Sequence, residues 1–192
     1  MMRRAPRRTR LALGLSAVAV ASTALGIGVS SALPSAHRVA IPPAHLDGMR
    51  ERMFSSLHSL ASASDAVVVA TATSTATTAD EGGIPVTVTS VDVVRTLRGS
   101  VPGTSIPIHQ LGAPGDALEG VPVLQSGKTY LLFLTAFHYV PGDDTGQYVA
   151  TGNPAGVFLQ DGSKYLRLDP QSTSLPSSTD ESQVLQAGQA MP

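Results

Sequence analysis

Seven short apolar runs, separated by turn residues, occupy most of the chain between residues 66 and 168. The runs are residues 66–75, 84–97, 104–109, 129–139, 147–151, 157–160 and 165–168. They are rich in the β-branched residues that favour strands, and turn residues such as Asp161-Gly162 stand between them, as expected for hairpins. The pattern predicts a mainly β fold in which the strands form a small, mostly antiparallel barrel.

Two of these runs carry further information about the barrel. In the second run the apolar residues change parity, from Val86 and Val88 to Val91 and Val93. A change of parity turns side chains to the opposite face of a strand, so we expect a β-bulge or a sharp bend at Thr89-Ser90. The run Leu131–Leu134 has no polar alternation, which predicts a strand that is covered on both faces.

An amphipathic helix is expected before the first strand. Apolar residues recur every three or four positions between residues 46 and 60, namely Leu46, Met49, Met53, Phe54, Leu57 and Leu60. After Pro170 the chain is rich in Ser, Thr, Gln and Pro without an apolar period, which predicts a disordered tail over residues 170–192. We therefore expect one domain, a helix plus a barrel, over residues 45–169, because the length leaves no room for a second core.

The N-terminus has the pattern of an export signal. Five arginines precede residue 11, residues 11–29 are uncharged and mostly small or apolar, and Ser30-Ser31-Ala32 offers small residues for signal-peptidase cleavage after Ala32. An uncleaved membrane anchor is the alternative, since residues 11–29 nearly span a hydrocarbon core of about 30 Å. Residues 33–44, with three prolines, are expected to be a spacer. The sequence thus predicts a protein of the cell envelope or the secreted fraction.

Charge and cysteine content restrict the function. Without the five leader arginines, eight basic residues face 14 acidic ones, a net charge of −6. The remaining basic residues are scattered, which disfavours nucleic-acid binding. The chain has no cysteine, so neither disulfides nor thiolate metal ligands are available and the domain must be stabilised by its core alone.

Four segments of the predicted barrel resemble a known family. They are residues 64–70 (SDAVVVA), 91–99 (VDVVRTLRG), 126–134 (SGKTYLLFL) and 152–158 (GNPAGVF). Their order and spacing, over residues 64–160, are similar to the bacterial exported relatives of the netrin-like and metalloproteinase-inhibitor domain. The resemblance implies an OB-like barrel. In that family's animal inhibitors an N-terminal cysteine chelates the protease zinc, and because this chain has no cysteine the resemblance transfers no inhibitory residue.

Motifs that would carry nucleotide or metal chemistry have simpler interpretations. Residues 125–129 (QSGKT) imitate the end of a phosphate-binding loop, but Pro122 stands where the first glycine belongs and a strand follows instead of a helix. We therefore predict a turn that leads into a strand. The histidines are His37, His45, His58, His109 and His138. No two have the spacing of metal ligands on one element, so no metal or other cofactor is expected, and His109 and His138 are assigned to strand ends at the surface.

The function that fits these observations is a non-catalytic interaction module whose partner is an extracytoplasmic macromolecule. No local motif of a nucleophilic or zinc hydrolase is present. The alternatives are a secreted enzyme whose catalytic group is assembled from distant residues, a protease-inhibitor-like protein and a structural envelope protein. Because a small barrel is filled by its own side chains, binding is expected on loops. The candidate binding residues are Tyr139, Asp143, Asp144 and Tyr148, around the turn at residues 141–146.

Overall fold

The computed structural model describes residues 53–81, 84–118 and 121–189. The predicted leader and spacer, and residues 46–52 of the predicted helix, lie outside this range. The elements are α1 (Leu57–Ser62), β1 (Ala66–Glu81), β2 (Ile84–Gly99), β3 (Ser105–Leu111), β4 (Ala117–Leu118), β5 (Val121–Pro122), β6 (Thr129–Ala136), β7 (Tyr148–Ala150), the 3-10 helix η1 (Asn153–Gly156), β8 (Val157–Asp161), β9 (Lys164–Arg167), β10 (Ser178–Thr179) and α2 (Glu181–Gln189).

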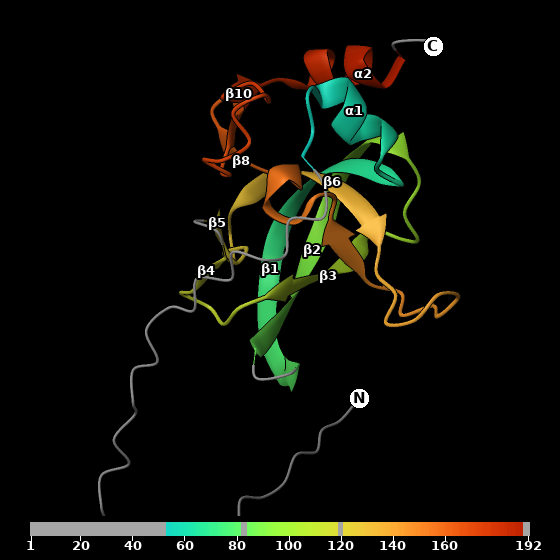
Figure 1. Ribbon diagram of the computed structural model, residues 1–192, viewed down its shortest axis with the longest axis vertical. Coiled ribbons are helices and arrows are strands. Elements are labelled where there is room, and N and C mark those ends of the chain that lie inside the picture. Colours follow the sequence, from blue (N-terminus) through green and yellow to red (C-terminus); the bar gives the residue numbers. More distant parts are fainter. Residues whose placement is uncertain (1–52, 82–83, 119–120, 190–192) are drawn as a thin grey trace, which may run out of the picture. The chain divides into compact units, whose positions relative to one another are not determined.

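Five strands close into a barrel, as the sequence predicted. The ring runs β1-β2-β3-β7-β6 and returns from β6 to β1. Its neighbours are antiparallel except β3 and β7, which pair in parallel through Ile108 and Tyr148. The strands β8, β9 and β10 continue the sheet from β6, outside the ring (Figure 1).

The first part of β1, residues 66–70, and the middle of β6, residues 130–134, are buried on both of their faces. Leu131, Leu132, Phe133 and Leu134 are all fully inaccessible, which confirms the expectation for this run. Leu132 and Leu134 join an inner core with side chains from every strand of the ring, whereas Leu131 and Phe133 join an outer core. The outer core also contains residues from α1, α2, β8 and β9, namely Leu60, Ala61, Phe158, Tyr165 and Val184. This wall is therefore the centre of the molecule.

A β-bulge in the second strand at Thr89-Ser90 is wrong, because the pairing of β2 with β3 is unbroken from Val86 to Asp92. The alternative, a sharp bend at that place, stays a prediction. The parity of the apolar residues changes because Thr87 and Thr89 are fully buried opposite inward-facing β3 positions. The inward-facing positions of β2 thus hold Thr87 and Thr89 first and the apolar Val91 after them.

The irregularity lies on the neighbouring strand. The β1–β2 register shifts between Ala72 and Ser74, which leaves Thr73 as the extra residue, and the Thr73 hydroxyl donates to the Ser90 carbonyl at 3.1 Å. The Thr89 hydroxyl is buried and has no hydrogen-bond partner among the described residues.

The helix before the barrel is shorter than predicted and begins later. Residues 53–56 are not helical, and α1 begins at Leu57 because Ser56 and Ser59 form a reciprocal capping box. Its C-terminus is held by Arg98, whose guanidinium donates to the carbonyls of Ala61 and Ser64. The predicted helix face is therefore wrong at Met53, which is 62% exposed.

The predicted disordered tail is also wrong for residues 170–189. Leu175 and Val184 are each 2% exposed, in the outer core. The Arg167 guanidinium donates to the carbonyls of Ser172 and Leu175 and so fixes the segment after β9. The domain therefore extends beyond residue 169.

The α2 helix is tied to three parts of the fold. Glu181 forms an ion pair with Arg95 of β2, and the Tyr165 hydroxyl of β9 donates to Glu181 Oε1 at 3.0 Å. The α1 and α2 helices lie side by side (Figure 1), and His58 Nδ1 donates to the Ala187 carbonyl at 2.7 Å. The segment has no regular apolar pattern, and it is held in place by two buried apolar side chains, Leu175 and Val184, and by these polar contacts.

Candidate functional site

The loop between β6 and β7, residues 137–147, is closed at its base by polar contacts. The Phe137 amide donates to the Gln147 carbonyl at 2.8 Å. The Thr145 hydroxyl donates to the Phe137 carbonyl at 2.5 Å and accepts from the Gln147 amide at 3.2 Å. These bonds continue the pairing of the two strands, so the loop leaves the barrel as an ordered hairpin. The strand predicted over residues 129–139 therefore ends at Ala136.

The tip of this loop is built from two tight turns. The Asp143 amide donates to the Val140 carbonyl at 3.1 Å, and His138 Nδ1 donates to the Asp143 carbonyl. The Gly146 amide donates to Asp144 Oδ1 at 3.0 Å, which is an Asx turn. The tip keeps its shape through main-chain and side-chain hydrogen bonds.

Three rings form a contiguous aromatic cluster at the loop, which comprises His109, Phe137 and Tyr139. The His109 and Phe137 rings stack with centroids 3.9 Å apart. Tyr139 meets Phe137 edge-on at 4.7 Å and His109 at 6.2 Å. His109 is buried, but Tyr139 is 60% exposed and the neighbouring Val140 62% exposed. The cluster thus presents one ring to solvent on a fixed support.

Tyr148 and two carboxylates lie at the base of the same loop. Tyr148 is half-buried at the start of β7. Burial raises the pKa of its phenol, and the negative charges of Asp65 and Asp144 raise it further. Asp65 is positioned by the Ala136 amide, which donates to its Oδ2 at 2.8 Å. Two negative charges therefore act on the Tyr148 phenol at the base of the loop.

The four predicted site residues all lie in or beside this loop, but they do not form one cluster. The negative charge of Asp144 raises the pKa of Tyr148, whereas Tyr139 packs against His109 and Phe137. Asp143 serves the tip through its main chain. The structure thus divides the candidate surface into two halves. The aromatic half is His109, Phe137 and Tyr139, and the acidic half is Asp65, Asp143, Asp144 and Tyr148.

Sequence reasoning missed three members of this surface, His109, Phe137 and Asp65. His109 was assigned to a strand end at the surface, yet it is 5% exposed because Phe137 covers it. Its Nδ1 also lies 3.3 Å from Gln147 Oε1. Alternation with the apolar Ile108 marks His109 as outward-facing on β3, but no local signal shows that a later loop would cover it.

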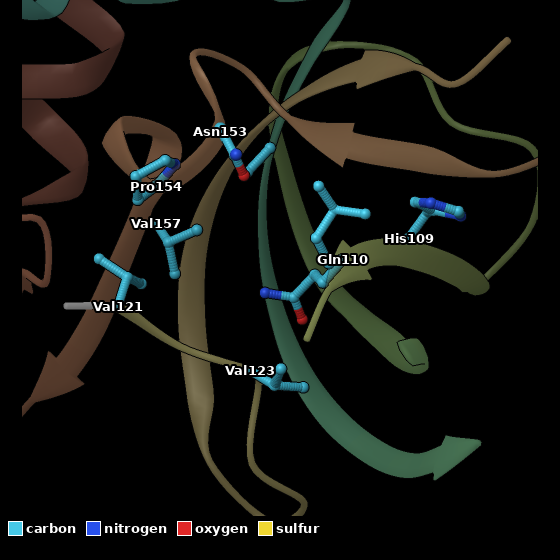
Figure 2. Close-up of a pocket in the computed structure, with 9 residues that line it drawn as sticks. His109, Gln110, Val121, Val123, Asn153, Pro154 and Val157 are labelled. Carbon is cyan, nitrogen blue, oxygen red and sulfur yellow. The ribbon is translucent and has the colours of Figure 1, made fainter. Parts of the chain in front are cut away.

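A small pocket lies beside the candidate surface, between β3 and η1 (Figure 2). Gln110 faces Asn153, Pro154 and Val157 across it, with Val121 and Val123 on a third side. Its volume of about 20 Å³ suffices for one water molecule. Binding sites for small molecules are far larger, so this pocket does not accommodate a substrate.

The phosphate-loop imitation at residues 125–129 is a turn that leads into β6, as predicted. The Gly127 amide donates to the Ala72 carbonyl at 2.7 Å, and the Ser126 hydroxyl donates to the Thr73 carbonyl at 2.7 Å. Both groups, which a phosphate would need, are therefore bonded to β1.

Two further properties concern the described residues alone. Within them, no three side chains of His, Asp or Glu are grouped so that they could hold a metal ion. None of the helices in this part of the chain has the length and apolar character required to cross a membrane.

Comparison with known proteins gives no assignment. The chain matches no protein-family model, and a search of curated proteins finds no significant match.

Proposed function

We propose that this protein is an exported, non-catalytic interaction module that binds an extracytoplasmic macromolecule through the β6–β7 loop. The observation that carries the proposal is the exposed ring of Tyr139, which is held by Phe137 and His109 instead of being buried in either core. Tyrosine is enriched among the residues that dominate binding at protein interfaces. A rigid aromatic anchor loses little conformational entropy when it binds.

The barrel itself offers little alternative surface for chemistry. Its interior is filled by its own side chains, and the adjacent pocket has room for one water molecule. In barrels of this size, ligands contact the outer loops and the rim. This supports recognition of a macromolecule in preference to turnover of an enclosed substrate.

The proposal also covers the family of the barrel and the export of the protein. The order of the ring and the parallel β3–β7 pair support an OB-like barrel and are compatible with descent from the exported netrin-like proteins. The basic, then apolar N-terminus supports export, with cleavage after Ala32 or retention as an anchor.

Site-specific photo-crosslinking tests the proposal. A photoreactive amino acid replaces Tyr139 in one variant and Leu166, an exposed residue of β9, in a control variant. Both proteins are produced in their native cells and irradiated. We expect a discrete crosslinked adduct from position 139 and none at the same mass from position 166. Identical adducts from both positions, or none from position 139, would refute the loop as the binding surface.

A further inference from the structure

The acidic half of the candidate surface is not neutralised within the described residues. Asp65, Asp143 and Asp144 surround the base and tip of the loop, and none of them forms an ion pair there. Residues 129–163 contain no lysine or arginine. Arg98 lies near Asp65 because β1 and β2 pair there, but its guanidinium donates to the carbonyls of Ala61 and Ser64. Within the described residues these carboxylates thus keep acceptor capacity for a cationic group.

The carboxylates are also held in place. Asp65 uses Oδ2 and Asp144 uses Oδ1 as acceptors of main-chain amides, so each keeps a second oxygen for another donor. The Asp143 amide donates to the carbonyl of Val140. Asp143 therefore lies across a tight turn from Val140, the residue that follows Tyr139. Pre-positioned acceptors reduce the entropy cost of binding.

The aromatic half of the surface suits the same kind of ligand. Tyr139 is edge-on to both of its aromatic neighbours, and its exposed fraction is 60%. A guanidinium group stacks on such a ring and donates to carboxylates in a planar, bidentate arrangement, which an ammonium group cannot do. The exposed Val140 offers apolar contact to an aliphatic side-chain stem.

We infer that the partner presents an arginine-containing, cationic polypeptide segment to the β6–β7 loop. This inference rests on the proposed function, because it specifies the chemistry of the partner at the same surface. Charge complementarity carries it: Asp143, Asp144 and the exposed ring of Tyr139 belong to one ordered loop, in a stretch of chain without lysine or arginine. The same carboxylates repel the phosphates of nucleic acids.

The test measures the affinity of the purified protein for three fluorescent peptides of equal length. One peptide alternates arginine with glycine, the second lysine with glycine, and the third glutamate with glycine. We expect the arginine peptide to bind more tightly than the lysine peptide, the glutamate peptide not to bind, and the affinity to fall as salt is added. Equal affinity for the arginine and lysine peptides would overturn the role of arginine.

Two loop variants and two controls locate the site. Tyr139→Ala should weaken arginine-peptide binding about tenfold, as for a residue that dominates an interface, and Tyr139→Phe, which keeps the ring, should bind like the wild type. The double variant Asp143→Asn, Asp144→Asn keeps the Asx-turn acceptor and should weaken binding about fivefold. The matched double variant Asp116→Asn, Asp161→Asn changes the charge equally at two exposed turns and should stay within about twofold of the wild type.

The outcomes separate this inference from the proposed function. If position 139 crosslinks to a partner but the arginine peptide does not bind, the loop is an interaction site and the cationic partner is wrong. If both double variants weaken the arginine peptide equally, the peptide responds to net charge alone, which also contradicts the inference. If neither the crosslink nor the peptide is observed, the proposed function itself fails.

Discussion

The β6 strand and the loop that follows it use apolar side chains in opposite ways. Along β6, Leu131 to Leu134 are inaccessible from both faces of the strand. A few residues later, Tyr139 and Val140 are mostly exposed, although hydrogen bonds order the loop around them. Burial in β6 stabilises the fold, whereas exposure in an ordered loop does not. This difference is why we propose the loop, and not the strand, as the binding surface.

The largest expected effect compares one aromatic residue from each region. Phe133→Ala removes a fully buried ring from the outer core and should lower the free energy of unfolding by about 3 to 5 kcal/mol. Tyr139→Ala should change it by no more than about 0.5 kcal/mol, as for surface substitutions. Urea denaturation followed by circular dichroism measures both. Equal losses would show that the loop ring is part of the core.

The second prediction concerns the cover over the outer face of β6. Truncation after Asp169 removes Leu175 and Val184 from the outer core together with the ion pair of Glu181. Burial of two such side chains contributes about 3 kcal/mol or more, so the melting temperature should fall clearly. A truncated chain that melts with the full-length protein would mean that the segment is dispensable.

A smaller gain is expected inside the barrel. The Thr89 hydroxyl is buried without a partner among the described residues, and an unsatisfied buried group destabilises a fold. Thr89→Val keeps the shape and should raise the free energy of unfolding by about 1 kcal/mol. Loss of stability would indicate that a bound water or another group satisfies the hydroxyl. Thr87→Val is the contrasting variant, because the Thr87 hydroxyl donates to the Gly112 carbonyl at 2.6 Å.

The smallest effect concerns alkaline pH. Burial, then the hydrogen bond to Glu181 and its negative charge, raise the pKa of Tyr165 from 10.0 to about 12. A pKa that is raised in the folded state stabilises the fold below the unfolded value of 10.0, and this contribution is lost as pH rises toward 12. Between these pH values the wild type should lose more stability than Tyr165→Phe, in thermal melts at fixed ionic strength. Parallel losses would contradict the role of the phenol.

The sequence predicted the strands because each has its own apolar pattern, and it missed features that depend on contacts between distant residues. Leu131–Leu134 needs no partner to indicate burial on both faces. Leu175 and Val184 are apolar residues in a polar segment. They are buried because they cover the outer face of β1 and β6, which the sequence of the tail alone does not show. Thr87 and Thr89 misled the bulge prediction because polar residues fill inner positions. Tyr139, Asp143, Asp144 and Tyr148 were predicted from the chemistry of one loop and lie in or beside it, and their role in binding stays a prediction. His109 and Asp65 lie at the same loop but belong to other parts of the chain, so no local signal could point to them.

The central claim is that the β6–β7 loop serves binding and not folding, and a shortened loop tests it most directly. Residues 138–146 are replaced by Asn-Gly, which suits a two-residue hairpin turn, between Phe137 and Gln147, already paired at 2.8 Å. The measurement is the amount of crosslink-identified partner that co-purifies with the shortened protein, after its thermal unfolding has been confirmed to match the wild type. We expect the partner to be lost. Retention of the partner at the wild-type level would contradict it.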